Sequence, residues 1–200
     1  MSEESLTTAA GILAPAGREA TAARRRKMPF LLVSLAVLVL DQWTKWLVEA
    51  HLPLSTSIDV IPGFLNFTHV RNTGVAFGLF ATHGHATGTW LLSALGIGAL
   101  VFVGYYFSRV PASDRLLLTS LALILGGAVG NLFDRIASGG VTDFVDFYVG
   151  SYHWHTFNVA DSAISVGIGL MLLGTFLQQH DDDEDKNKDQ NNTAPAPSGS

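Results

Sequence analysis

The chain has 200 residues, of which 48% are hydrophobic and only 14% charged, and its mean hydropathy is +0.31, a composition typical of a protein that lies in lipid. Its net charge of -5 comes largely from the acidic segment 181–185, and no basic face indicates a nucleic acid partner. Cysteine is absent, which excludes a thiol nucleophile, a disulfide framework and a thiolate metal site.

The N-terminal segment 1–27 is small, polar and finally basic, and is predicted to be a disordered cytoplasmic tail. The first long apolar stretch follows it, over about residues 29–49. A basic cluster before an apolar run also opens a secretory signal peptide, but no small-x-small cleavage site follows, because the chain continues DQWTKW at 41–46. A membrane-spanning helix is therefore the favoured prediction, and a cleaved signal peptide is the weaker one.

Residues 50–87 form a long connection in which β-branched and aromatic residues gather at 58–60 and 64–70. Pro62 and Gly63 lie between these two runs and are typical of a turn. The connection is predicted to contain a small hairpin or short sheet at the outer membrane surface.

Three further apolar stretches lie at about 88–107, 116–136 and 159–177. At about 1.5 Å per residue, each is long enough for a helix that spans a hydrocarbon core about 30 Å thick. Backbone groups in lipid must bond internally, so helices are expected. The acidic end, 181–200, is predicted to be a second disordered tail. The predicted fold is an all-α membrane protein, with a four-helix transmembrane domain at 28–180 and a small β element in the outer connection.

Lysine and arginine are unevenly distributed between the two sides that these helices define. They gather in both tails and in the short turn that carries Arg109 and Arg115, whereas the opposite side carries only Arg71. The positive-inside bias therefore predicts that both termini are cytoplasmic.

Polar and ionisable residues near a bilayer are costly and usually face a bundle interior or a watery cavity. They occur here at Asp41 and Lys45 in the first helix, at Asn131, Asp134 and Arg135 in the third, at Asp143 and Asp146 in the next connection, and at Asn158 and Asp161 at the start of the fourth. Because the third helix runs outward and the fourth runs inward, most of these groups are expected to converge toward the outer leaflet.

Asp143 and Asp161 form the candidate catalytic pair. Two carboxylates held close together cannot both ionise easily, so one keeps a proton near neutral pH. The ionised member can accept a proton from water while its partner donates to a carbonyl oxygen, which is the chemistry of aspartyl proteolysis and needs no metal. Structural interpretations of single residues stay open: Asp134 pairing with Arg135, Asp161 as an ordinary first-turn acid, and Asp146 as a solvated loop carboxylate.

Five segments carry a resemblance to a known family. They are DQWTK at 41–45, RNTGVAF at 71–77, GGAVGNLFDR at 126–135, VTDF at 141–144 and FNVADS at 157–162. In these segments and their order, the chain resembles the lipoprotein signal peptidase family, also called signal peptidase II, over about residues 30–178. The resemblance implies a membrane-embedded aspartyl endopeptidase that cleaves the signal peptide from diacylglyceryl-modified bacterial prolipoproteins, just before the lipidated cysteine.

The resemblance also implies which residues act. It implies that Asp143 and Asp161 are catalytic, and that supporting or substrate-binding roles fall to Asp41, Lys45, Asn72, Asn131, Asp134, Arg135 and Asn158. Within it, Asn131 and Asn158 are expected to orient carboxylates, the Asn72 loop to cover the substrate as a lid, and Asp41 and Lys45 to tie the first helix to the bundle. The expected place is the bacterial plasma membrane, with the active site toward the outer leaflet. The expected partners are prolipoprotein substrates and membrane lipids, with no cofactor, metal or obligate protein partner.

A small proton-coupled transporter or channel subunit is the alternative, since it would use the same acids as a relay. Against it, the polar groups gather at one membrane face, and the sequence has no inverted repeats or broken helices.

Two His-x-His pairs, at 83–85 and 153–155, lack acids or cysteines at helical spacing and do not favour zinc. The sequence contains no Gly-x-Ser-x-Gly elbow, so a serine peptidase is not favoured.

Overall fold

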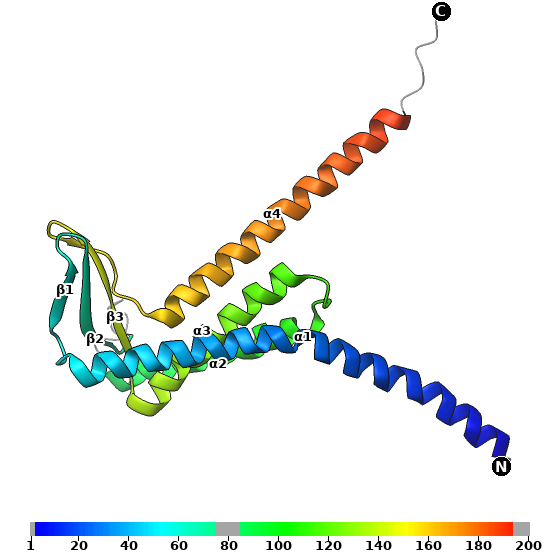
Figure 1. Ribbon diagram of the computed structural model, residues 1–200, viewed down its shortest axis with the longest axis horizontal. Coiled ribbons are helices and arrows are strands. Elements are labelled where there is room, and N and C mark those ends of the chain that lie inside the picture. The colour runs from blue at the N-terminus through cyan, green and yellow to red at the C-terminus, as the bar shows by residue number, and fades with distance from the viewer. Residues whose placement is uncertain (1–2, 75–84, 194–200) are drawn as a thin grey trace, which may run out of the picture.

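The computed structural model describes residues 3–74 and 85–193, and the side chains of 26–74 and 89–180. Its elements in chain order are α1 (Glu3–His51), β1 (Ser57–Ile61), β2 (Leu65–Asn72), α2 (His85–Arg109), α3 (Arg115–Ser138), β3 (Val141–Val149), β4 (Tyr152–His153) and α4 (Val159–Thr193). The strands gather at one end of the helices, and the turn between α2 and α3 lies at the other (Figure 1).

Each helix contains a segment long and apolar enough to cross a membrane. These segments are Arg26–His51, Thr89–Arg109, Arg115–Ser138 and Val159–His180. Large apolar side chains point outward along them, among them Leu32, Val101 and Phe176, which are 60%, 67% and 68% exposed. Such faces are stable only against lipid. The prediction of four transmembrane helices is confirmed, and the protein is a multi-pass membrane protein.

Helix α3 is the central helix, because it packs against α1, α2 and α4. Its start is capped by Asp114, whose side chain accepts a hydrogen bond from the Leu117 backbone at 3.0 Å. Its end is closed by Gly139 in the left-handed conformation, with φ of 75° and a backbone N–H that donates to Arg135 O. Both caps are local sequence signals, and they set the length of the helix.

Glycines allow the close packing of α3 against its neighbours. A Cβ on Gly126 would lie 2.6 Å from the backbone oxygen of Ser34 on α1, and one on Gly127 would collide with the backbone oxygen of Ala160 on α4. The approach of three helices therefore depends on positions without a side chain.

The strands form one antiparallel sheet in the order β1-β2-β3-β4. The β1–β2 hairpin, with Gly63 at φ of 83° in its turn, confirms the predicted β element. The connection between the third and fourth helices, for which no strand was predicted, also contains β structure, since β3 and β4 lie there. The sequence VTDFVDFYV of β3 is rich in β-branched and aromatic residues, but its principal partner β2 is distant in the chain, which the local pattern did not indicate.

Helices α1 and α4 extend into the two terminal segments that composition predicts to be tails. The backbone of α1 is helical from Glu3 and that of α4 continues to Thr193. Ala, Glu and Arg, which are frequent in the N-terminal extension, have high helix propensity, whereas the C-terminal extension is rich in Asp and Asn, which do not. The boundaries 1–27, 28–180 and 181–200 stay a prediction.

Candidate active site

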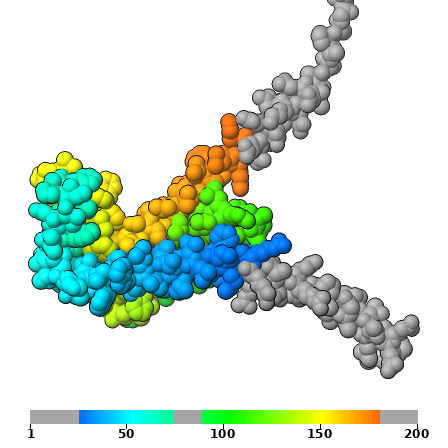
Figure 2. All heavy atoms as spheres, in the orientation of Figure 1, coloured from blue at the N-terminus to red at the C-terminus, as the bar shows by residue number. Residues whose placement is uncertain are grey.

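The sheet covers the ends of α1, α3 and α4 and brings the predicted catalytic pair to one place. In Figure 2 it lies beyond the C-terminal end of α1, as the cyan and yellow spheres at one end of the molecule. Asp143 lies on β3 and its side chain is almost fully buried, at 2% exposure. Asp161 lies in the first turn of α4.

Asp161 is held by a reciprocal cap at the start of α4. The side-chain oxygen of Asn158 accepts a hydrogen bond from the Asp161 backbone N–H at 2.9 Å, and the Asp161 Oδ2 accepts one from the Asn158 backbone N–H at 3.3 Å. This is the capping-box pattern, with Asn and Asp in the two positions. Asp161 is therefore a first-turn acid of α4, as the structural interpretation held. Its other carboxylate oxygen, Oδ1, faces the polar cluster described next.

Two asparagines link the two carboxylates. Asn158 donates from Nδ2 to Asp143 Oδ1 at 2.7 Å, and Asn131 donates from Nδ2 to Asp161 Oδ1 at 2.7 Å. The two amides also touch, with 3.3 Å between Asn158 Nδ2 and Asn131 Oδ1. A continuous path of side-chain hydrogen bonds thus runs from β3 through α4 and α3 to the second carboxylate.

Asn72, at the end of β2, contacts the other side of Asp143. Its Nδ2 donates to Asp143 Oδ2 at 3.0 Å, and its Oδ1 accepts from the Gly74 backbone at 2.9 Å. Gly74 has φ of 79°, so the chain turns there in a conformation that favours glycine. The rest of the segment expected to act as a lid, 75–84, lies outside the described residues.

Burial raises the pKa of Asp143 to about 6, and the negative charge of Asp161 adds to the rise. Hydrogen bonds from Asn72 and Asn158 and the charge of Lys45 oppose it. A carboxyl group with this pKa keeps its proton over a wider pH range than an ordinary aspartate does. This suits an acid that must donate a proton to a substrate.

Lys45 lies beneath the asparagines and joins three helices. Its Nζ donates to Asp41 Oδ2 at 2.8 Å and to Asn131 Oδ1 at 3.0 Å, and lies 2.6 Å from Asp134 Oδ2. Asp41 in turn accepts from the Ala160 backbone N–H at 2.9 Å. Lys45 and Asp41 are buried, at 3% and 0% exposure, so these pairs hold α1 against α3 and α4 away from water.

Asp134 corrects one expectation. It forms its ion pair with Lys45 and accepts from Gln42 Nε2 at 2.8 Å, whereas the sequence suggested a pair with its neighbour Arg135. Adjacent residues of a helix point about 100° apart, so Arg135 turns toward the site instead. Its Nη1 donates to Asn131 O at 3.2 Å, and its charge interacts with Asp161 and Asp143, and least with Asp134.

The environment of Asp146 also differs from the one that the sequence suggested. The structure places it on β3 with 6% exposure, and it accepts from Asn66 Nδ2 at 3.3 Å and pairs with His153 Nδ1 at 2.9 Å. It is therefore a buried strand residue and not a solvated loop carboxylate. His153 is half exposed and stacks on Tyr148 with ring centroids 5.1 Å apart. Among the described residues, no three His, Cys, Asp or Glu side chains are grouped to hold a metal ion; the side chains of 83–85 are outside them.

A cavity of about 340 Å³ opens beside Asp143. It is lined by Val70, Arg71, Asn72, Thr73, Asp143, Trp154, His155 and Thr156. Sequence reasoning missed Trp154, His155 and Thr156 as lining residues, and it missed Gln42 as a partner of Asp134. For Gln42 a signal existed, because it lies in the DQWTK segment next to Asp41.

The fold is that of a membrane-embedded protein, and a pair of amide-bonded carboxylates is the kind of site that an aspartic peptidase uses. Comparison with known proteins gives the family. The sequence model of the family described as signal peptidase (SPase) II matches residues 33–177. The chain therefore belongs to the signal peptidase II family, which is a family of peptidases and leaves the transporter alternative without support.

Relatives and solved structures agree. The lipoprotein signal peptidase of Solibacter usitatus is 45% identical over 70% of this chain and 86% of its own length. That of Desulforapulum autotrophicum is 47% identical over 68% of this chain and 85% of its own length. A solved bacterial membrane enzyme matches with a TM-score of 0.64 at 30% identity, over 74% of this chain and 92% of that one.

Proposed function

We propose that the protein is an aspartyl endopeptidase that removes the signal peptide from diacylglyceryl-modified prolipoproteins, just before the lipidated cysteine, with Asp143 and Asp161 as its catalytic pair. The observation that carries the proposal is the path Asp143–Asn158–Asn131–Asp161, in which each carboxylate receives an amide hydrogen bond of 2.7 Å. Two carboxyl groups with different environments and one shared network are what aspartyl proteolysis needs.

The pair performs two proton transfers in this mechanism. Asp161, in its ionised form, accepts a proton from water, and the resulting hydroxide oxygen attacks the carbonyl carbon of the scissile peptide bond. Asp143, whose raised pKa favours its protonated form, donates its proton to the carbonyl oxygen. The tetrahedral intermediate then collapses, the peptide C–N bond breaks, and the leaving amine takes a proton from the pair.

The surroundings support each step. Arg135 lies close enough to interact with both charges and offsets the negative charge that two carboxylates concentrate. Asn131 and Asn158 fix the orientation of the carboxylates, since their own side chains are held by Lys45 and by the α4 backbone. The cavity beside Asn72 and Trp154 provides room for an extended peptide next to Asp143.

A membrane location suits a lipid-modified substrate. Diacylglyceryl chains cannot leave the bilayer cheaply, at about 0.8 kcal/mol per buried CH₂ group, so the bond to be cut stays near the membrane surface. The site lies at the ends of the transmembrane segments, under the sheet, which is the depth that such a substrate reaches. In the proposed orientation, with both termini cytoplasmic, this is the outer leaflet.

The test uses purified full-length protein and a diacylglyceryl-modified prolipoprotein, with the products identified by mass spectrometry. We expect cleavage on the N-terminal side of the lipidated cysteine, unaffected by chelators, and lost in both Asp143→Asn and Asp161→Asn. Asp59→Asn is the matched control, because Asp59 is an exposed aspartate on β1 outside the cluster. Full turnover in either of the first two variants would remove the catalytic assignment, and cleavage at another bond would remove the substrate assignment.

A further inference from the structure

A second cavity lies at the opposite end of the molecule from the candidate active site. Its volume is about 740 Å³, and it is lined by residues of α1, of the turn between α2 and α3, and of the first turns of α3, among them Arg26, Phe30, Ser113 and Arg115. Arg115 is the first residue of the transmembrane segment in α3, and the apolar run of α1 follows directly after Arg26 and Lys27. The cavity therefore lies at the depth where lipid headgroups meet the hydrocarbon.

Among the side chains that the structure describes, four Lys or Arg residues lie at this end, and two of them, Lys27 and Arg109, contact other parts of the protein. Lys27 donates from Nζ to the backbone oxygens of Phe107 and Ser108, at 3.0 and 2.8 Å, and so closes the C-terminus of α2. Arg109 lies over the ring of Tyr105, 5.1 Å from its centroid. These two cations thus have internal roles.

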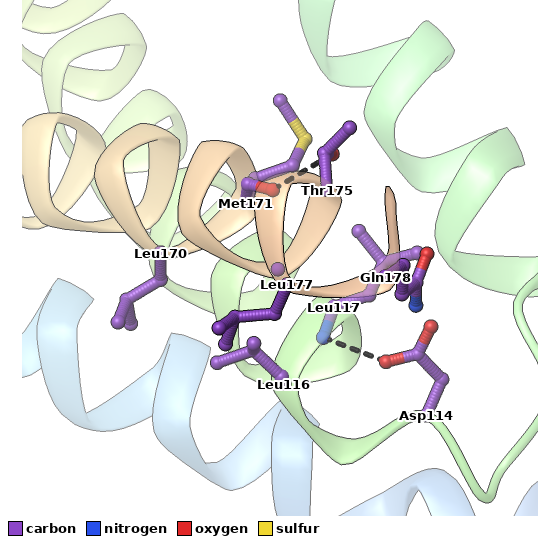
Figure 3. Close-up of a pocket in the computed structure, with 9 residues that line it drawn as sticks. Asp114, Leu116, Leu117, Leu170, Met171, Thr175, Leu177 and Gln178 are labelled. Atoms are coloured by element: carbon purple, nitrogen blue, oxygen red, sulfur yellow. Dashed lines mark hydrogen bonds between the residues drawn. The ribbon is translucent and has the colours of Figure 1, made fainter. Parts of the chain in front are cut away.

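Arg26 and Arg115 have no such internal role in the structure. Among the described side chains, neither guanidinium makes a hydrogen bond or an ion pair, and both line the same cavity. The nearest acid along the chain, Asp114, is directed at the Leu117 backbone and lines a separate pocket between α3 and α4, beside Thr175 and Gln178 (Figure 3). Two positive charges therefore meet in a cavity without a carboxylate among its lining residues.

We propose that this cavity binds the headgroup phosphate of an anionic glycerophospholipid. A guanidinium offers paired N–H donors that match phosphate oxygens, and basic pockets between transmembrane helices are typical sites for such headgroups. The cavity also has an apolar side, at Pro29 and Phe30, against which the first part of an acyl chain can lie. An apolar wall beside two cations favours a lipid over free phosphate.

The site would join α1 to the α2–α3 turn through a bound lipid. It is independent of the peptidase chemistry, because none of its residues contacts the cluster around Asp143. Under the proposed orientation, its lipid belongs to the cytoplasmic leaflet, where the positive-inside pattern places these arginines.

Native mass spectrometry of the full-length protein in detergent tests the proposal, with phosphatidylglycerol, phosphatidylcholine of the same acyl chains, and inorganic phosphate as probes. We expect phosphatidylglycerol to bind most tightly, and Arg26→Gln with Arg115→Gln to weaken its binding by roughly tenfold or more, since both substitutions remove a positive charge beside the headgroup. Arg109→Gln is the matched control and should bind like the unchanged protein, because Arg109 does not line the cavity.

A second pair, Arg26→Lys with Arg115→Lys, keeps both charges and should retain most of the binding, which separates loss of charge from loss of fold. Equal affinity for the two lipids, inorganic phosphate that binds as tightly as phosphatidylglycerol, or unchanged binding in the double glutamine variant would each overturn the proposal. Cleavage of a prolipoprotein is not its readout, so its failure leaves the peptidase assignment untouched.

Discussion

The side chain of Asn158 donates to Asp143 at 2.7 Å, and this one contact joins strand β3 to the N-terminus of α4. The same side chain accepts from the Asp161 backbone through its oxygen. A single asparagine therefore caps a helix, orients one carboxylate and fixes the segment that carries the other. Position 158 consequently couples the stability of the fold to the geometry of the site.

The first prediction concerns this asparagine. Asn158→Ala should lower the free energy of unfolding by about 1–3 kcal/mol, because it removes a helix cap and a buried hydrogen bond to a carboxylate. It should also lower turnover strongly. Asn158→Asp should keep the cap and much of the stability, yet lose turnover, because it adds a negative charge beside Asp143. Denaturation in mixed micelles and a cleavage assay measure the two effects.

Asp114→Ala is the control for the loss of a cap. Asp114 caps α3 at the far end of the molecule, so its loss should cost about 1 kcal/mol while turnover of the folded protein stays unchanged. A parallel loss of turnover in Asp114→Ala would indicate that destabilisation alone explains the effect at position 158.

The second prediction concerns pH. The pKa of Asp143 is raised from 3.8 to about 6, so between these values the folded protein keeps a proton that the unfolded chain releases. The contribution of this group to stability is therefore fully present below pH 3.8 and is lost as the pH rises through about 6. Activity that needs the protonated acid should fall on the alkaline side of the same range.

Asn72→Ala should move that alkaline limb. The amide of Asn72 favours the ionised form of Asp143, so its removal raises the pKa of this carboxyl and shifts the decline in kcat/KM to higher pH. Asn66→Ala removes an amide from the same strand that bonds to Asp146 instead, and should leave the profile in place. A profile that stays unmoved in Asn72→Ala would argue against Asp143 as the titrating acid.

The third prediction concerns the buried Lys45. Lys45→Met leaves the carboxylates of Asp41 and Asp134 without their cation, which should cost about 3–5 kcal/mol of unfolding free energy. Asp41→Asn combined with Lys45→Met should cost less than the sum of the single changes, because the double variant leaves one fewer buried charge. Strict additivity in a double-mutant cycle would contradict direct coupling of the pair.

The fourth prediction concerns helix packing. Gly126→Ala should lower the unfolding free energy by about 1–3 kcal/mol, because the new Cβ would approach the Ser34 backbone to 2.6 Å and force α1 away from α3. Gly98→Ala on α2 is the control, since nothing lies within 4 Å of a Cβ there. Its replacement should be neutral or slightly stabilising in the same denaturation assay.

The fifth prediction concerns orientation. The chain has no cysteine, so a single introduced thiol can be labelled without background. Ser151→Cys, at the β3–β4 turn, should react with a membrane-impermeant maleimide on intact spheroplasts, whereas Ser113→Cys, in the α2–α3 turn, should react only after permeabilisation. The reverse pattern would invert the topology and place the site at the inner leaflet.

Local and periodic features of the sequence were sufficient to predict much of the fold and the family. Long apolar runs determined the four transmembrane helices, because lipid leaves the backbone no other way to satisfy its hydrogen bonds. Pro62 and Gly63 between β-forming runs determined the first hairpin, and five short segments indicated the family.

Only the tertiary structure decided the contacts that make the site. The pairing of β2 with β3 brings Asn72 to Asp143 across 71 residues of chain, and it turns Asp146 from an apparent loop acid into a buried partner of His153. The choice of Lys45 over Arg135 as the cation for Asp134 likewise depends on how α1 packs against α3. Composition and periodicity report which environment a segment prefers, but hydrogen bonds between distant side chains depend on packing that no local pattern encodes.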